Sequence, residues 1–298
     1  MQIFGIVKFY FVIKAALLMK NPYQNLVIYY FEGVIDPDRS VTGNPRFLGN
    51  WQEADTSFVF FCEPVPQLAK QMGGCHPGAR LVDVYEMTFA QWHGEDIAPY
   101  TAAGFFVHPP WEQGSDDPDI RNIILDPGVV FGTGRHQTTR DCLEMVQAVC
   151  VEEKIQTVVD IGTGTGLLAL GAAAMGCSRV LACDFNLLAV QTARKNIVRN
   201  RCADRVLAFQ ARGETLMDLP CDLVVANIHY DIMQHLIVHP ALAEKKYLIL
   251  SGLLPSQARK VKKVLENRQV RIRDHRSPDG IWHTFLAEPR AGNCRSIQ

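Results

Sequence analysis

The chain has 298 residues, of which 48% are hydrophobic and 20% are charged, and its formal net charge is −1. This length is sufficient for two domains with their own cores, and the composition is typical of a globular protein. Nine cysteines are scattered without a C-x-x-C pair, which argues against a disulfide framework and favours a reducing compartment, so we expect a cytoplasmic protein.

The charge is unevenly distributed along the chain. Residues 21–120 carry four basic and fourteen acidic side chains, whereas residues 121–298 carry 23 basic and 17 acidic ones. An acidic N-terminal part attracts a basic partner and repels a nucleic-acid backbone, so we expect a basic protein partner and no DNA. The alternative is an acidic, solvated surface without a partner.

Residues 1–18, MQIFGIVKFYFVIKAALL, are apolar but are interrupted by Lys8 and Lys14. The apolar pieces are too short for a signal peptide or a membrane span, so no membrane association is expected. Met19 precedes a segment typical of a domain start. We therefore predict that residues 1–18 are a non-native or disordered extension.

The N-terminal part reads as a small α+β domain, residues 19–111. Residues 33–50 are turn-rich, and strand and helix patterns occur before and after them. The predicted strands are 25–31, 57–62, 80–87 and 105–107, and the predicted helices are 64–73 and one beginning at 89–92. Residues 112–122 are polar and acidic and contain Pro118, so they are predicted to be a linker.

A glycine-rich stretch follows the linker. Residues 126–139, DPGVVFGTGRHQTT, contain three glycines and end in Thr138 and Thr139. Either threonine can cap the predicted helix 140–150. Such a loop can close over a cofactor, and the alternative interpretation is an interdomain turn.

The central stretch of the chain is TVVDIGTGTG, residues 157–166. It predicts a buried strand, 157–161, a turn with glycines at 162, 164 and 166, and a helix, 167–176. Glycines suit a tight turn and allow a ligand to approach bare backbone, and the helix N-terminus offers free N–H groups to a polar ligand. The alternative is a structural turn without a ligand.

A second predicted strand, 179–183, ends at Asp184, 22 positions after Gly162. An acid at this place can accept hydrogen bonds from both ribose hydroxyls of a nucleoside cofactor. The dinucleotide fingerprint G-x-G-x-x-G does not fit, because Leu167 stands where it requires glycine. A nicotinamide dehydrogenase is therefore disfavoured, and the pattern D-x-G-x-G-x-G, beginning at Asp160, indicates a different nucleoside cofactor.

The remaining predicted elements complete an alternating α/β pattern. They are helix 187–200, strand 205–210, strand 221–228, strand 247–250, helix 255–267, and a hairpin of strands 269–273 and 282–287. Ligands of open α/β sheets bind at the carboxyl ends of strands, so Asn227 lies where chemistry is expected. His235 and His239 have metal-binding helical spacing but no H-E-x-x-H motif, so no metal site is predicted.

Five motifs in this order resemble the ribosomal protein L11 methyltransferase family, which consists of class I S-adenosylmethionine-dependent methyltransferases. They are residues 126–139, residues 160–166, Asp184, residues 224–228 (VVANI) and residues 250–254 (LSGLL). The resemblance implies a Rossmann-like seven-stranded methyltransferase domain, residues 123–290, preceded by a substrate-recognition domain and followed by a tail, residues 291–298.

The resemblance also implies S-adenosylmethionine as the cofactor. The residues expected to bind it are Phe131, Gly132, Thr133, Thr139, Asp160, Gly162, Gly164, Gly166, Asp184 and Asn227. Asn227 is also the candidate catalytic residue, because its side-chain carbonyl can accept an N–H bond from the reacting amine. His229 and Tyr230 depart from the family pattern, which has leucine and then a small residue at these positions.

The implied function is methylation of lysine and α-amino nitrogens of a large-subunit ribosomal protein by a monomeric enzyme. Two alternatives remain open at this point. One is a lysine methyltransferase acting on another protein, such as the electron-transfer flavoprotein β-subunit, which shares these motifs. The other is a non-catalytic module that binds S-adenosylmethionine.

Overall fold

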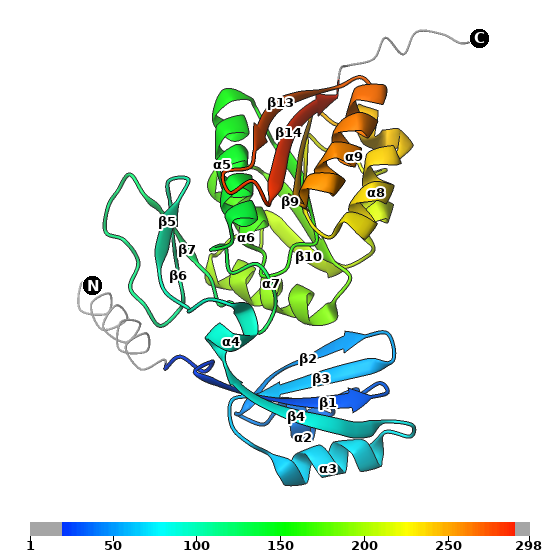
Figure 1. Cartoon of the computed structure of the whole chain (residues 1–298). Coiled ribbons are helices and arrows are strands. Elements are labelled where there is room, and N and C mark those ends of the chain that lie inside the picture. Colours follow the sequence, from blue (N-terminus) through cyan, green and yellow to red (C-terminus); the bar gives the residue numbers. More distant parts are fainter. Residues whose placement is uncertain (1–19, 290–298) are drawn as a thin grey trace.

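The computed structural model describes residues 20–289, and these residues form three sheets with helices packed against them (Figure 1). The predicted extension, residues 1–18, and the predicted tail, residues 291–298, lie outside this range. Within it, no helix is both long enough and apolar enough to cross a membrane.

The first sheet is antiparallel, with strand order β2-β3-β1-β4. Its strands are β1 (Asn25–Glu32), β2 (Phe47–Glu53), β3 (Thr56–Phe61) and β4 (Arg80–Thr88). Alternate residues of β1 point to opposite faces, one toward α2 (Arg39–Thr42) and α3 (Pro66–Cys75), the other toward the second domain. The prediction of turns over residues 33–50 missed both α2 and the start of β2. The start of β2 was missed because its first residues resemble a turn, and they form a strand only by pairing with β3.

The second sheet is a small one that belongs to the core of the large domain. It consists of β5 (Tyr100–Ala102), β6 (Phe105–His108) and β7 (Arg121–Ile124). Phe105, Val107 and Ile123 are buried in the same apolar cluster as helices α5 (Gln137–Glu152) and α6 (Leu167–Ala174). Because β7 begins inside the predicted linker, we propose a domain boundary between α4 (Phe89–His93) and β5 instead of at residues 112–122.

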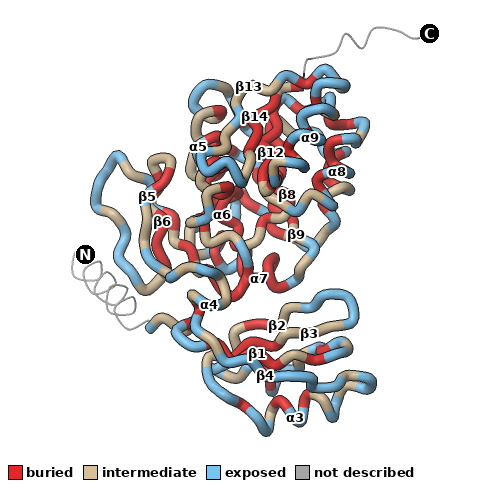
Figure 2. Tube along the Cα trace, viewed as in Figure 1, coloured by how far each residue is buried: buried red, intermediate tan, exposed pale blue. Residues whose placement is uncertain are grey.

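The third sheet has seven strands in the order β10-β9-β8-β11-β12-β14-β13, as expected for the predicted Rossmann-like seven-stranded domain. The strands are β8 (Thr157–Ile161), β9 (Arg179–Asp184), β10 (Val206–Gln210), β11 (Leu223–Asn227), β12 (Tyr247–Leu253), β13 (Val270–Arg276) and β14 (His283–Pro289). Five strands run parallel, and β14 and β13 complete the sheet in antiparallel pairings. Central strands of this sheet are buried on both faces (Figure 2).

Two groups of helices cover the faces of this sheet (Figure 1). One face carries α5 (Gln137–Glu152), α6 (Leu167–Ala174) and α7 (Leu187–Arg199), and the other carries α8 (Tyr230–Val238) and α9 (Pro255–Asn267). Two short 3₁₀ helices, η1 (Gly213–Leu216) and η2 (Pro240–Glu244), contribute buried residues to this second face. Both faces are therefore covered, as a mostly parallel sheet requires.

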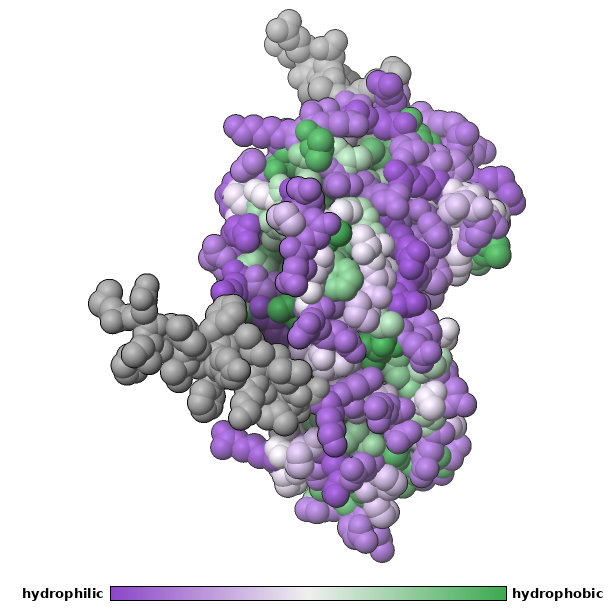
Figure 3. All heavy atoms as spheres, turned by 90° about the vertical axis from the view of Figure 1, so that its left-hand side faces the viewer, coloured by the Kyte–Doolittle hydropathy of each residue, from purple (hydrophilic) through white to green (hydrophobic). Residues whose placement is uncertain are grey.

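The two domains are joined by apolar contacts and by hydrogen bonds, among them a network around Asp126. The Tyr23 hydroxyl donates to Oδ1 of Asp126 at 2.6 Å, and Asp126 also pairs with Arg199 of α7 at 3.0 Å. Gly49 of β2 lies against Leu188, whose Cδ1 would be 2.6 Å from a Cβ at position 49. On the face shown in Figure 3, hydrophobic residues reach the surface at the narrow waist between the domains.

If β5–β7 are part of the large domain, truncation of Phe105 must destabilise that domain. Phe105 is fully buried, so we expect Phe105→Ala to lower the free energy of unfolding by about 3–5 kcal/mol. Urea unfolding followed by circular dichroism measures this change. Leu207→Ala, at an exposed position of β10, is the control and is expected to change stability by less than about 0.5 kcal/mol. A Phe105→Ala protein as stable as the control contradicts the proposed boundary.

Candidate active site

The glycine loop, residues 162–166, follows β8 and has three residues in the left-handed region. The φ angles of Gly162, Gly164 and Gly166 are 73°, 54° and 88°. A Cβ at position 162 would lie 2.3 Å from Cγ2 of Ile228, and one at position 164 would lie 2.4 Å from the carbonyl oxygen of Phe131. These positions therefore require glycine both for backbone conformation and for close approach of neighbouring chain.

Asp184 and Asn227 end the two strands that flank β8 in the sheet. The strand order β9-β8-β11 places them on the same carboxyl edge, one on each side of the glycine loop. The carboxylate of Asp184 accepts from the backbone N–H of Gly164 at 3.0 Å and of Asn186 at 2.9 Å. Burial raises the pKa of Asp184, and these backbone donors partly oppose that rise.

Asp160 lies at the end of β8, directly beneath the glycine loop, and is fully buried. Its Oδ2 accepts from the Thr163 hydroxyl at 2.6 Å, whereas its Oδ1 is buried without a hydrogen-bond partner. Burial raises the pKa of Asp160 to about 7. A fully buried polar oxygen without a partner, directly below the glycine loop, fits a site that receives a polar ligand.

Asn227 is held by two threonines of α5. Its Nδ2 group donates to the hydroxyl oxygens of Thr138 at 3.2 Å and Thr139 at 3.3 Å. The prediction that one of these threonines caps α5 is wrong, because the N-cap is His136, whose ring accepts from the Thr138 N–H at 3.4 Å. The threonine hydroxyls are turned toward Asn227 instead, and they fix the orientation of its amide.

The FGTG loop, residues 131–134, rests on the glycine loop. The carbonyl of Phe131 accepts from the Thr165 N–H at 3.2 Å, and the Thr165 hydroxyl donates to the carbonyl of Gly132 at 2.5 Å. The Thr133 side chain, by contrast, turns away from the glycine loop and donates to the carboxylate of Glu95. The Thr133 hydroxyl is therefore occupied by Glu95, and only the backbone of Thr133 remains to fill its predicted role in cofactor binding.

One aromatic residue next to the N-cap of α5 was not predicted. The ring of Trp282, next to β14, meets the ring of His136 edge to face with centroids 5.1 Å apart. Sequence patterns carried no signal for this contact, because the turn between β13 and β14 reaches α5 only through the packing of the sheet. Tyr230 lies under the ammonium group of Lys260, 5.4 Å from the ring centroid, at the start of α8.

Across residues 20–289, no three His, Cys, Asp or Glu side chains are gathered in a way that could hold a metal ion. His235 lies in the last turn of α8 and His239 caps η2, where its ring accepts from the Ala241 N–H. The groups that the structure brings together at this edge are the carboxyl groups of Asp160 and Asp184, backbone N–H groups of the glycine loop, and the oriented amide of Asn227.

The raised pKa of Asp160 predicts a specific pH dependence of stability. The folded protein holds this proton up to about pH 7, whereas an unfolded Asp loses it near 3.8. Stability contributed by the protonated carboxyl therefore falls as pH rises from about 4 to 7, by up to about 1.4 kcal/mol per pH unit. Asp160→Asn removes this titration, so its stability relative to the original protein must increase over that range. Urea unfolding at several pH values tests this, and a pH-independent difference contradicts it.

Both the sequence and the structure of this chain are similar to those of known proteins. Residues 69–288 match the family described as ribosomal protein L11 methyltransferase (PrmA). The ribosomal protein L11 methyltransferase of Desulforamulus reducens is 34% identical over 182 residues, 60% of this chain and 58% of that protein. The enzyme of the same name from Aliivibrio fischeri is 35% identical over 215 residues, 70% of this chain and 69% of that protein.

A solved structure agrees with these sequence matches. The ribosomal protein L11 methylase of Lactobacillus delbrueckii subsp. bulgaricus shares 30% identity and a TM-score of 0.55, over 63% of this chain and 96% of that one. Among the curated relatives, those from Desulforamulus reducens and Shewanella sediminis are matched over only 58% and 53% of their own length. The family match covers well over half of the chain and confirms the resemblance inferred from the motifs, so this chain belongs to the ribosomal protein L11 methyltransferase family.

Proposed function

We propose that the protein is an S-adenosylmethionine-dependent methyltransferase that methylates amino groups of ribosomal protein L11. The observation that carries this proposal is the placement of Asn227 on the same sheet edge as Asp184, with the glycine loop between them. One side of this edge offers a carboxylate and bare backbone to a nucleoside cofactor. The other side offers an oriented amide to an incoming amine.

The residues present fit the cofactor. Two observations support the fit, namely the unpartnered Oδ1 of Asp160 and the left-handed backbone of the glycine loop. Asp160, the three glycines of the loop, Asp184, the FGTG loop, Thr139 and Asn227 would hold S-adenosylmethionine, and Asn227 would also face the acceptor. When bound, S-adenosylmethionine supplies a methyl group attached to a positively charged sulfur, and it is the carbon of this methyl group that an amine nitrogen can attack.

The residues on the acceptor side have two tasks, which are to orient the amine and to favour its neutral form. A lysine ammonium with a pKa near ~10.4 is almost fully charged at neutral pH and has no free lone pair. Partial exclusion of water next to the half-buried Asn227 and Ile228 lowers that pKa. Because Thr138 and Thr139 hold Nδ2 of Asn227, its Oδ1 faces away from them and can accept an N–H of the amine. Orientation of this kind contributes up to roughly 7–11 kcal/mol in favourable cases.

The first domain provides a surface for a protein substrate. Edge strand β4 is exposed along most of its length and presents four apolar side chains, Leu81, Val82, Val84 and Tyr85. Together with the acidic surplus of residues 21–120, this edge suits a basic protein partner better than DNA or a membrane surface. We include in the proposal a cytoplasmic, monomeric enzyme whose first domain recognises the substrate.

Methyl transfer from radiolabelled S-adenosylmethionine tests the proposal directly. Purified ribosomal protein L11 and a lysate from cells lacking this protein serve as acceptors, with the electron-transfer flavoprotein β-subunit as a competing candidate. We expect label in ribosomal protein L11, on lysine or α-amino nitrogen. Label only in another protein overturns the substrate, and cofactor binding without transfer to any acceptor overturns the activity.

The role of Asn227 predicts a loss of turnover rather than of folding. Asn227→Ala removes the amide that orients the amine, so kcat at saturating cofactor is expected to fall roughly 100-fold. Ile232→Ala, at an exposed position of α8, is the matched control and is expected to keep its kcat. Steady-state kinetics with both substrates measures the change, and full kcat in Asn227→Ala contradicts the assigned role.

A further inference from the structure

The FGTG loop is held from two sides. Its inner side bonds to Thr165 of the glycine loop, as described above. Its outer side meets residues 95–100, the segment that connects α4 to β5 outside the seven-stranded sheet. A loop of this glycine content has little conformational preference of its own, so its position depends on both sets of contacts.

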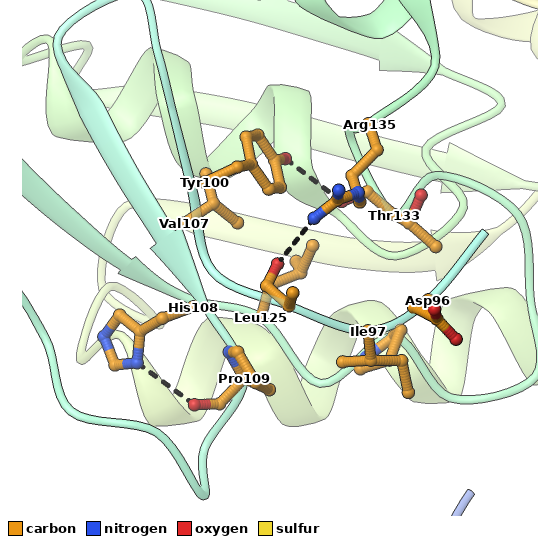
Figure 4. A pocket seen from close by; sticks show the side chains of 11 residues that line it. Asp96, Ile97, Tyr100, Val107, His108, Pro109, Leu125, Thr133 and Arg135 are labelled. Carbon is orange, nitrogen blue, oxygen red and sulfur yellow. Dashed lines mark hydrogen bonds between the residues drawn. The ribbon is translucent and has the colours of Figure 1, made fainter. Parts of the chain in front are cut away.

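Three hydrogen bonds join residues 95–100 to the FGTG loop and its neighbour. The Thr133 hydroxyl donates to the Glu95 carboxylate, and the Tyr100 hydroxyl donates to the Thr133 carbonyl at 3.0 Å. Arg135 Nη1 donates to the carbonyl of Ala98 at 3.1 Å. Figure 4 shows Tyr100, Thr133 and Arg135 converging around a small cavity of about 20 Å³.

Tyr100 is fitted closely to this position. A Cβ at position 134 would lie 1.7 Å from the Tyr100 hydroxyl oxygen, so the contact requires Gly134. The guanidinium groups of Arg135 and Arg140 lie over the Tyr100 ring, 5.9 and 5.7 Å from its centroid. Burial raises the pKa of Tyr100, so its hydroxyl remains a donor at neutral pH.

The first domain adds apolar contacts to the same loop. The ring of Trp51 in β2 meets Phe131 edge to face at 5.7 Å, and the ring of His93 in α4 meets it at 6.0 Å. Burial lowers the pKa of His93 to about 4, so this ring is neutral and packs as an apolar group. The Trp92 indole N–H donates to the carbonyl of Val129, just before the loop, at 3.1 Å.

We infer that Glu95 and Tyr100 are positioning residues that hold the FGTG loop closed over the cofactor site. This inference depends on the proposed cofactor, and it adds that the affinity for this cofactor is set partly by residues outside the nucleotide-binding sheet. Neither residue touches the acceptor side, where Asn227 is held by Thr138 and Thr139. Loss of either residue therefore weakens cofactor binding and leaves the chemical step intact.

Two variants test the inference in the full chain. Tyr100→Phe removes one hydroxyl and keeps the ring, and Glu95→Ala removes the carboxylate. We expect the dissociation constant for S-adenosylhomocysteine, measured by calorimetry, to rise roughly 5-fold for Tyr100→Phe and roughly 10-fold or more for Glu95→Ala. The KM for S-adenosylmethionine should rise in parallel, with kcat at saturating cofactor within about twofold of the original protein.

The controls separate loop closure from general stability. Tyr30→Phe removes a hydroxyl from the first domain without touching the loop, and Glu95→Gln keeps an oxygen that can accept from Thr133. Both are expected to retain the original dissociation constant within about twofold. Dissociation constants of Tyr100→Phe and Glu95→Ala that equal those of the controls overturn the inference, as does a loss confined to kcat.

A measurement without cofactor keeps the inference independent of the proposed function. Arg135 follows the FGTG loop directly and is held by Ala98, so trypsin should cut after it faster when the loop opens. We expect faster cleavage there in Tyr100→Phe and Glu95→Ala than in the original protein and the two controls. If no form binds S-adenosylhomocysteine, the proposed function fails, but the cleavage rates still decide whether residues 95–100 hold the loop. Equal cleavage rates in all forms overturn the inference.

Discussion

The structure depends on a contact between two glycine-containing loops at the carboxyl edge of the main sheet. The carbonyl of Phe131 lies where a side chain at position 164 would begin, and Thr165 bonds to the FGTG loop through both its N–H and its hydroxyl. Only bare backbone permits this approach. The contact brings residues that precede α5 next to residues that follow β8. The FGTG loop therefore lies at the same sheet edge as the ends of β9 and β11.

The same contact links the two domains. Gly132 touches the glycine loop from one side, while Phe131 and Thr133 receive contacts from β2, α4 and residues 95–100 on the other. The half-buried Tyr23–Asp126–Arg199 network fixes the chain just before the loop. A protein bound to the first domain therefore acts on an element that is physically continuous with the cofactor side of the site.

Sequence reasoning predicted the elements whose signals are local. The strand, glycine turn and helix from Thr157 onward follow from composition and spacing within about twenty residues, and so does the position of Asp184 at a strand end. Features that depend on distant partners could not be predicted in this way. β7 begins in the last two residues of the predicted linker because β6 pairs with it, and Thr133 turns outward because Glu95, 38 positions away, accepts a hydrogen bond from its hydroxyl.

The two halves of the site differ in how they are held. Asn227 ends a buried strand and donates to two threonines of α5, so the proposed acceptor side is built from regular elements that resist displacement. The cofactor side depends on a glycine-containing loop whose closed position is stabilised by contacts from outside the sheet. The amide of Asn227 and the FGTG loop are supported by different segments of the chain. Changes in the first domain should therefore weaken the proposed cofactor binding before they alter the proposed alignment of the amine.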